Sequence, residues 1–325
     1  MNIRIAICGY GNLGKGAERA ALAAPDIDLV AIFTRRPNEP LRTLGNVPAL
    51  PLSALRHWKN RVDVLLLCGG SATDLPRQTP TFAADFNTVD SFDTHEKIPA
   101  HFAAVDRAAR SSGHLALISA GWDPGLFSAA RSLFASVLPN GESVTFWGRG
   151  VSQGHSDAIR RLPGVRDARE YTVPIPEAAE QAEHGQLAGL TPTKTHRREC
   201  YVVAEDGANR AKIERDIRTM PNYFQGYETT VTFVTQEELT RDHSELPHGG
   251  RVIRSGKTAA DHTHTLTMGL QSDSNPALTG SVLVACSRAV ARLRANGTTG
   301  CITPLDLSPA LLSPLPPDLQ RKQFL

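Results

Sequence analysis

The chain has 325 residues, of which 41% are hydrophobic and 21% charged, and its formal net charge is +2. This length exceeds what one hydrophobic core supports, so we expect two or three domains. The composition is ordinary for a soluble globular protein. The small net charge and the lack of a long basic run argue against a nucleic-acid partner. No stretch of about 18 apolar residues occurs, so we expect no membrane span.

Two further absences narrow the class of protein. The N-terminus enters a predicted strand at once, which leaves no room for a signal peptide. His262 and His264 alternate on one predicted strand without a nearby cysteine or carboxylate cluster, so we expect no metal site.

The cysteines are widely spread, form no C-x-x-C pair and predict buried, reduced thiols in a cytoplasmic protein. They are Cys8, Cys68, Cys200, Cys286 and Cys301.

The chain opens on a strand, a glycine turn, a helix and a second strand. These elements are predicted over residues 2–8, 9–14, 15–24 and 29–33. A G-x-G-x-x-G turn in this context is typical of a dinucleotide site, whose pyrophosphate faces the helix N-terminus. Gly9 permits the tight turn, Gly11 lets backbone N–H groups approach the pyrophosphate, and Gly14 lets helix and strand pack closely. The alternative is a glycine-rich turn in another kind of α/β domain.

The end of the second strand indicates which dinucleotide is bound. NAD sites usually place an acidic residue there, about 20 residues past the glycines, to bind the ribose 2′-hydroxyl. This chain places Thr34, Arg35 and Arg36 there. Because a guanidinium presents a planar fork of donors that suits a phosphate, the sequence predicts NADP(H). The alternative is that the two arginines belong to a solvated loop.

Strands and helices continue to alternate up to about residue 120. Strands are predicted over residues 64–68, 87–91 and 115–119, with helices near 75–84 and 99–111 between them. This order predicts a doubly wound parallel sheet of the Rossmann type. Ligands of such sheets lie beyond the carboxyl ends of the strands. The segments at these ends are 68–71, 90–93 and 120–125.

The pattern changes after about residue 140, where strand-forming segments follow one another without long helices. They are residues 143–147, 170–173, 199–203, 229–234 and 263–270. With a helix over 207–220, they predict an α+β domain with a mostly antiparallel sheet. A long helix is expected over 277–296, and the proline-rich tail is expected to be extended or loop. We therefore expect a dinucleotide-binding domain, residues 1–120 plus about 276–325. A substrate and dimerisation domain is expected over about 121–275.

Several longer runs of sequence resemble the meso-diaminopimelate D-dehydrogenase family. In the first predicted domain they are residues 9–14, 33–36, 70–74 and 119–127, the last containing Gly-Trp-Asp-Pro-Gly. In the second they are residues 145–148, 152–158, 216–221 and 247–250. The likeness runs from residue 2 to about residue 315. Several of these runs are long and occur in few other families.

The resemblance implies an activity: NADP-dependent, reversible oxidative deamination of the D-centre of meso-2,6-diaminopimelate. The products would be L-2-amino-6-oxopimelate, which cyclises to tetrahydrodipicolinate, and ammonia. The reverse reaction would serve lysine and diaminopimelate biosynthesis. Family members are homodimers, so self-association is implied as well. The implied cofactor contacts are Gly9, Tyr10, Gly11, Asn12, Leu13, Gly14, Thr34, Arg35, Arg36, Cys68, Gly69, Gly70, Ser71, Ala72, Asp93, Gly121, Trp122, Asp123, Pro124 and Gly125.

Asp93 and Asp123 are the candidate catalytic residues, because each lies just past a predicted strand end. Carboxylates there can hold the reacting amine, and one can take its proton. By resemblance both also contact the substrate. The alternatives are a turn role for Asp123 ahead of Pro124 and a helix start for Asp93.

Arg198 is the candidate clamp for the distal carboxylate at the L-centre, which a guanidinium can bind at two points. By resemblance, Thr172 and His248 complete that clamp. The alternatives are a surface ion pair for Arg198 and a turn role for His248. The further substrate contacts implied by the resemblance are Trp122, Phe146, Trp147, Gln153, Gly154, Asp157 and Asn275.

Two rival functions remain open at the level of sequence. One is another NAD(P) oxidoreductase of the same architecture, such as a dihydrodipicolinate reductase. The other is a non-catalytic NADP-binding sensor, which would have no reason to keep Asp93, Asp123 and Arg198 together. The chain also departs from the family at Gly69, at Thr34 and over residues 258–264.

Overall fold

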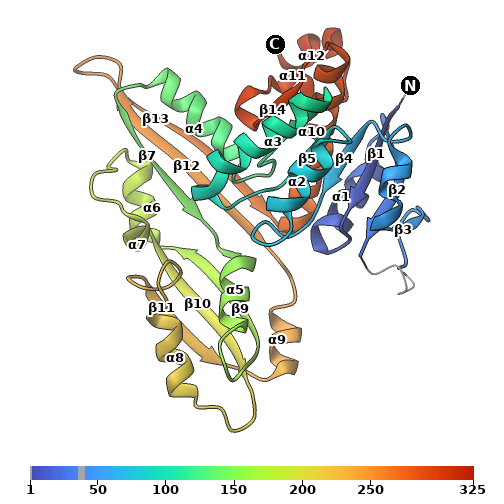
Figure 1. The fold of residues 1–325 in the computed structure, drawn as a ribbon. Coiled ribbons are helices and arrows are strands. Elements are labelled where there is room, and N and C mark those ends of the chain that lie inside the picture. Colours follow the sequence, from blue (N-terminus) through green and yellow to red (C-terminus); the bar gives the residue numbers. More distant parts are fainter. Residues whose placement is uncertain (1, 36–40) are drawn as a thin grey trace. The chain divides into compact units, whose positions relative to one another are not determined.

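The computed structural model describes residues 2–35 and 41–325, and the chain divides into two compact units (Figure 1). The first unit is Met1–Ala129 with Pro276–Leu325, and the second is Ala130–Asn275. The chain crosses from the first to the second inside helix α4 (Leu126–Val137). The first unit therefore includes the start of α4, and the chain returns to it at Pro276.

The first unit is built on a parallel seven-stranded sheet in the order β14-β6-β5-β4-β1-β2-β3. Strand β1 lies between β2 and β4, and the chain runs outward from it through β2 and β3 on one side before it returns to β4 on the other. That reversal is where doubly wound sheets bind ligands. The strands are β1 (Ile3–Cys8), β2 (Ile27–Thr34), β3 (Ala49–Pro51), β4 (Val64–Leu67), β5 (Thr88–Asp90), β6 (Leu115–Leu117) and β14 (Gly300–Ile302).

Both faces of this sheet are buried, which explains its continuous apolar strands. Ile5 and Ile7 pack in one core cluster with helices α1 and α10. Ala6 and Cys8, which alternate with them, pack in another. The helices are α1 (Asn12–Ala23), α2 (Leu75–Ala83), α3 (Ile98–Ser112), α10 (Asn275–Ala295), α11 (Pro309–Leu312) and α12 (Pro317–Phe324), with short 3₁₀ helices at Leu52–Trp58, His95–Lys97 and Pro304–Asp306.

Helix α10 returns the chain to the first unit and is fixed there by an ion pair as well as by apolar packing. The Arg288 guanidinium donates two hydrogen bonds of 2.7 Å to the Asp26 carboxylate. Beyond α10, β14 extends the sheet and pairs with β6. The tail that follows was expected to be extended or loop, but it contains α11 and α12. Both begin at a proline, which the first turn of a helix accommodates because its N–H groups have no partner within the helix.

The second unit contains two sheets (Figure 1). One is antiparallel, in the order β13-β12-β7, and the other has the order β11-β10-β9-β8 with a single parallel pair, β10 with β11. The strands are β7 (Gly141–Trp147), β8 (Gly150–Val151), β9 (Val165–Pro174), β10 (His196–Ala204), β11 (Glu228–Phe233), β12 (His248–Lys257) and β13 (Thr263–Ser272). The helices are α5 (Gln153–Arg160), α6 (Pro176–Glu183), α7 (Pro192–Thr195), α8 (Arg210–Arg218) and α9 (Gln236–Asp242).

The predicted fold class, a Rossmann-type sheet plus an α+β domain with a mostly antiparallel sheet, is confirmed. All five cysteines are buried free thiols. Among residues 2–35 and 41–325, no helix combines the length and the apolar character that crossing a bilayer requires.

Candidate active site

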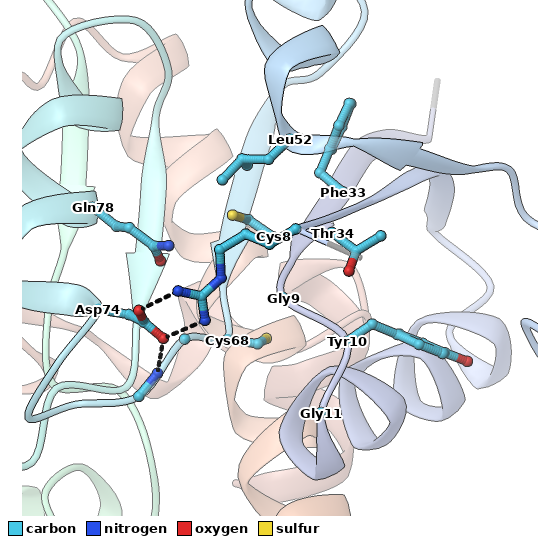
Figure 2. A pocket seen from close by; sticks show the side chains of 13 residues that line it. Cys8, Gly9, Tyr10, Gly11, Phe33, Thr34, Leu52, Cys68, Asp74 and Gln78 are labelled. Atoms are coloured by element: carbon cyan, nitrogen blue, oxygen red, sulfur yellow. Dashed lines mark hydrogen bonds and ion pairs between the residues drawn. The ribbon is translucent and has the colours of Figure 1, made fainter. Parts of the chain in front are cut away.

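A cavity of about 450 Å³ lies at the carboxyl ends of β1, β2 and β4 (Figure 2). The wall includes Phe33 and Leu52, which are apolar, and Asp74 and Gln78, which are polar. The predicted cofactor contacts that line it are Gly9, Tyr10, Gly11, Thr34, Arg35, Cys68, Gly69 and Gly70. The glycine turn and the end of the second strand therefore meet as the motif predicts.

The glycine turn leaves room for a pyrophosphate. Gly9 has a φ of +99°, a conformation that favours glycine. A Cβ on Gly14 would lie 2.1 Å from the Gly9 carbonyl oxygen, so strand and helix pack there without space for a side chain. A Cβ on Gly11 would meet nothing within 4 Å, so the start of α1 is open. Asn12 and Leu13 form the first turn of that helix, whose N–H groups suit an anion.

The polar wall of the cavity contains a two-point ion pair. Arg35 Nη1 donates to Asp74 Oδ1 at 2.9 Å, and Nη2 donates to Oδ2 at 3.1 Å (Figure 2). Asp74 Oδ2 also accepts from the Gly70 N–H at 3.1 Å. Gln78 Oε1 is buried and has no donor among the described residues. Arg36, the second predicted phosphate ligand, lies outside the described residues.

Tyr10, which follows Gly9, contacts Glu18, and Glu18 in turn binds the loop that contains Leu44 and Gly45. The Tyr10 hydroxyl donates to the buried carboxylate of Glu18 on α1. Burial, with the Glu18 hydrogen bond, raises the pKa of Tyr10 to about 12. Glu18 Oε1 in turn accepts from the backbone N–H groups of Leu44 and Gly45, at 2.8 and 3.1 Å. Glu18 on α1 thus holds the backbone at Leu44 and Gly45.

Asp93 and Asp123 lie on the loops that follow β5 and β6. Asp93 is exposed, and its N–H donates to Ser71 Oγ at 2.9 Å, which joins its loop to the one that follows β4. Ala72, the next residue, is exposed. Asp123 is half-buried between Trp122 and Pro124. Both aspartates therefore belong to the first unit, on loops that follow neighbouring strands of the sheet that forms the cavity.

The loop from Gly121 to Gly125 is tightly packed. Trp122 is buried and packs edge-on against Phe127, with ring centroids 5.3 Å apart. Gly125 has a φ of +132°, and a Cβ there would lie 1.8 Å from the Gly121 carbonyl oxygen. The loop thus has one shape, with Trp122 fixed at its base.

Arg198 lies in the second unit, in a buried polar cluster. Its strand β10 pairs with β9 so that Arg198 faces Thr172, and the guanidinium donates to the Thr172 hydroxyl. Arg198 Nη1 also lies 3.4 Å from Oε1 of Glu170, which is fully buried. The Tyr227 ring stacks on the guanidinium at 4.3 Å. Because Arg198 is only 8% exposed, the surface ion-pair alternative is excluded.

Burial and the charge of Arg198 both shift the pKa values of the groups in this cluster. Burial raises the pKa of Glu170 to about 7, although the positive charge of Arg198 acts in the opposite direction. Burial, with the charge of Arg198, lowers the pKa of His155 to about 3, so this imidazole is neutral. Glu170 Oε2 and Arg198 Nε are both buried without a partner among the described residues. Arg198, the candidate clamp, therefore keeps one N–H donor, at Nε, that no described residue uses.

His248 and Trp147 lie near the two strands that carry Arg198 and Thr172: His248 lies against Gly150, and Trp147 lies against His196. Gly150 pairs with Thr172, and a Cβ on Gly150 would lie 2.5 Å from the His248 ring. The Trp147 N–H donates to Nε2 of His196 at 2.8 Å. Burial lowers the pKa of His196 to about 4, consistent with a neutral ring that accepts this bond. Arg198 and Thr172 thus face each other on paired strands, and His248, on β12 of the other sheet, lies against Gly150, the partner of Thr172.

The remaining predicted substrate contacts are more scattered within the second unit. Phe146 packs in an apolar cluster with Ala182 and Ile253. Gln153 and Gly154 are exposed at the start of α5, and the half-buried Asp157 on the same helix pairs with Arg161. Asn275 begins α10, and its N–H donates to the Leu246 carbonyl at 2.9 Å. Their substrate roles stay predictions.

Comparison with known proteins finds relatives along the whole chain. The family described as "Diaminopimelic acid dehydrogenase C-terminal domain" matches residues 121–274. The meso-diaminopimelate D-dehydrogenase of Ureibacillus thermosphaericus is 53% identical over 323 residues, which cover 99% of each protein. A structure of C. glutamicum DAP dehydrogenase in complex with DAP is 45% identical, with a TM-score of 0.94, and covers 100% of this chain and 99% of that one. An engineered D-amino acid dehydrogenase bound to NADP+ is 44% identical, with a TM-score of 0.90 and full coverage of both chains.

Proposed function

The chain belongs to the meso-diaminopimelate D-dehydrogenase family, and we propose that it oxidatively deaminates the D-centre of meso-2,6-diaminopimelate with NADP+. The products are L-2-amino-6-oxopimelate, which cyclises to tetrahydrodipicolinate, and ammonia. The reaction is reversible, and its reverse is a reductive amination in lysine and diaminopimelate biosynthesis. The observation that carries this proposal is the close identity along the whole chain, rather than over the cofactor domain alone.

The first unit supplies the cofactor site. The open space at Gly11 and the donors at the start of α1 suit the pyrophosphate. Arg35 and Thr34 suit the 2′-phosphate, and Gln78 offers a buried acceptor without a donor. When bound, NADP+ supplies the hydride acceptor. The absence of an acidic residue directly after β2 disfavours NAD.

Asp93 and Asp123 handle the reacting amine. A carboxylate oxygen accepts a hydrogen bond from the ammonium group and takes its proton, because the nitrogen lone pair must be free before the C=N bond forms. Trp122 beside them is a buried aromatic surface that excludes water. No nucleophile from the protein is required, because water adds to the C=N bond and releases ammonia, and most of the protein's contribution is positioning.

Arg198, Thr172 and His248 bind the distal carboxylate at the L-centre. An amino acid without that carboxylate leaves a buried guanidinium without its anionic partner, which is costly. The clamp therefore favours a dicarboxylic amino acid over a shorter one. The L-centre, whose carboxylate Arg198 binds, therefore does not react, and the D-centre does.

We also propose a homodimer in the cytoplasm. The α4 side chains Leu133 and Val137 are 62% and 57% exposed, and they lie one turn apart on the same face. Five reduced thiols suit a reducing compartment. Size-exclusion chromatography with light scattering tests the dimer, and a monomer at micromolar concentration would contradict it.

A spectrophotometric assay of NADPH formation tests the activity. We expect turnover with the meso and DD isomers and none with the LL isomer, and NADP+ should be preferred over NAD+. Free ammonium should be released in equal amount. Turnover of the LL isomer, or none with any isomer, would overturn the proposed function. The latter result would favour a binding protein.

A further inference from the structure

The side chain of Asp90, the last residue of β5, is fully buried and accepts four hydrogen bonds. Oδ1 accepts from the backbone N–H groups of Phe92 and Ser119, at 3.0 and 2.8 Å. Oδ2 accepts from the Thr79 hydroxyl at 2.7 Å and lies 2.8 Å from His101 Nε2. A buried carboxylate is costly unless it is fully satisfied, and here both oxygens have two partners.

The two oxygens of Asp90 face different parts of the first unit. Oδ2 meets side chains of α2 and α3, which cover the sheet. Oδ1 meets only backbone, on the loops that follow β5 and β6. The backbone carbonyl of Asp90 also accepts from the Ala120 N–H at 2.8 Å. One residue thus joins the loop that carries Asp93 to the loop that carries Asp123.

The bond to Ser119 holds a conformation that the chain would not adopt by itself. Ser119 has a φ of +59°, which is unfavourable for a residue with a Cβ. Its N–H is taken by Asp90, whereas its buried hydroxyl has no partner among the described residues. The bond to Phe92 is local and could form in any turn that begins with aspartate. The bond to Ser119 spans 29 residues and is the specific one.

The loop that follows β5 is also held in place, through Phe92 and Asp93. The Phe92 ring stacks on His101 with centroids 4.1 Å apart and an interplanar angle of 21°. The next residue, Asp93, is tied through its N–H to Ser71 in the cofactor loop. The geometry is therefore fixed from β4 through β5 to β6, along the edge of the sheet where the reaction is placed.

We propose that Asp90 is a positioning residue, whose Oδ1 sets the backbone of both loops so that Asp93 and Asp123 act on one reacting amine. The proposal rests on the proposed function, because it gives those two carboxylates a shared task. Asp90 itself is fully buried behind the loops and does not touch the substrate.

Three variants test the bonds of Asp90, with the bonds at Oδ2 lost in Asp90→Ser as well and one of them lost alone in Thr79→Val. Asp90→Asn keeps an acceptor for both loop N–H groups, and its amide can donate to Thr79 and to the other tautomer of His101. Asp90→Ser keeps the local bond to Phe92 but is too short to reach Ser119. Thr79→Val removes only a bond to Oδ2 and is the matched control.

We expect kcat with meso-2,6-diaminopimelate to fall at least about tenfold in Asp90→Ser, because small misplacements of catalytic groups lower the reaction rate strongly. Asp90→Asn and Thr79→Val should stay within about threefold of the unmodified protein, and the NADP+ Kd should change less than about threefold in all variants. Hydrogen–deuterium exchange in Asp90→Ser should quicken over residues 91–94 and 119–125 but not over 9–14. This readout does not depend on turnover.

A folded Asp90→Ser variant with unchanged kcat or unchanged exchange in the two loops would overturn this proposal alone. An equal loss of kcat in Thr79→Val would do the same, because the effect would then not come from Oδ1. An unmodified protein with no turnover would instead overturn the proposed function, and the shared task of the two aspartates with it.

Discussion

Arg35 and Asp74 form a two-point ion pair in the dinucleotide cavity, with Nη1 to Oδ1 at 2.9 Å and Nη2 to Oδ2 at 3.1 Å. Arg35 is 67% exposed and Asp74 13% exposed at the side chain. Because the Arg35 side chain is largely exposed, the pair contributes little to stability. We therefore expect that the guanidinium can exchange this carboxylate for a phosphate at low cost.

Arg35→Ala should raise the Kd for NADP+ by about tenfold or more, because charge-assisted hydrogen bonds to the 2′-phosphate are lost. The Kd for NAD+, which lacks that phosphate, should change little. Arg77→Ala is the matched control, since it removes the same charge from an exposed position on α2 outside the cavity. Fluorescence titration with both dinucleotides checks this, and an equal loss for both would refute the phosphate role.

Gly14→Ala should lower the stability of the fold, whereas Gly11→Ala should weaken NADP+ binding. A Cβ on Gly14 would lie 2.1 Å from a backbone oxygen, so the folded state should lose about 1–3 kcal/mol. A Cβ on Gly11 would meet no protein atom within 4 Å, so stability should be kept while the Kd for NADP+ rises about tenfold or more. Thermal melts and cofactor titrations distinguish these outcomes. Normal NADP+ binding by Gly11→Ala would place the pyrophosphate elsewhere.

Arg198→Met should lower kcat/KM for meso-2,6-diaminopimelate by about 100-fold or more, because a buried carboxylate loses its charged partner. The Kd for NADP+ should stay unchanged, since Arg198 lies in the other unit. Arg197→Met is a close control on the same strand, where the side chain is exposed. Should the two variants behave alike, or NADP+ binding weaken equally, the clamp assignment is wrong.

Glu170 should make stability depend on pH in an unusual direction. Burial raises the pKa of Glu170 from its ordinary value of 4.5 to about 7 in the folded protein. Between these values the folded state holds a proton that the unfolded chain has lost, so stability falls as pH rises through this window. Relative to Glu170→Gln, the unmodified protein should therefore lose free energy of unfolding from pH 4.5 to 7. Urea unfolding at several pH values measures this, and parallel profiles for the two proteins would refute it.

The cofactor half of the fold could be predicted because its local signals agree with one another. Residues 64–67 are apolar throughout and residues 3–8 are apolar except for Arg4, since both sheet faces are buried. The glycine turn needs particular residues at particular positions, so the sequence itself reveals it. Strand β12, by contrast, was not predicted. Its ten residues include three glycines and two arginines, and it is a strand because it pairs with β7 on one side and β13 on the other.

The supporting residues of the site were harder to find. Glu170 reads as an ordinary charged strand residue, and only the register of β9 against β10 places it beside Arg198. Asp90 lies within a predicted strand-end segment, yet its role depends on Ser119, far away in sequence. Asp74 and Gln78 lie within and after a recognised motif, but their place in the cavity depends on how α2 packs. Partners that tertiary packing creates leave no pattern in the local sequence.

The most direct test of the whole account is to follow the hydride with meso-2,6-diaminopimelate that carries deuterium only at the D-centre carbon. Mass spectrometry of the reduced cofactor should find one deuterium per NADPH formed, with turnover slowed if hydride transfer is rate-limiting. The same compound labelled only at the L-centre should yield unlabelled NADPH. Transfer of the L-centre label, or reduced cofactor without label from the D-centre compound, would contradict the central claim.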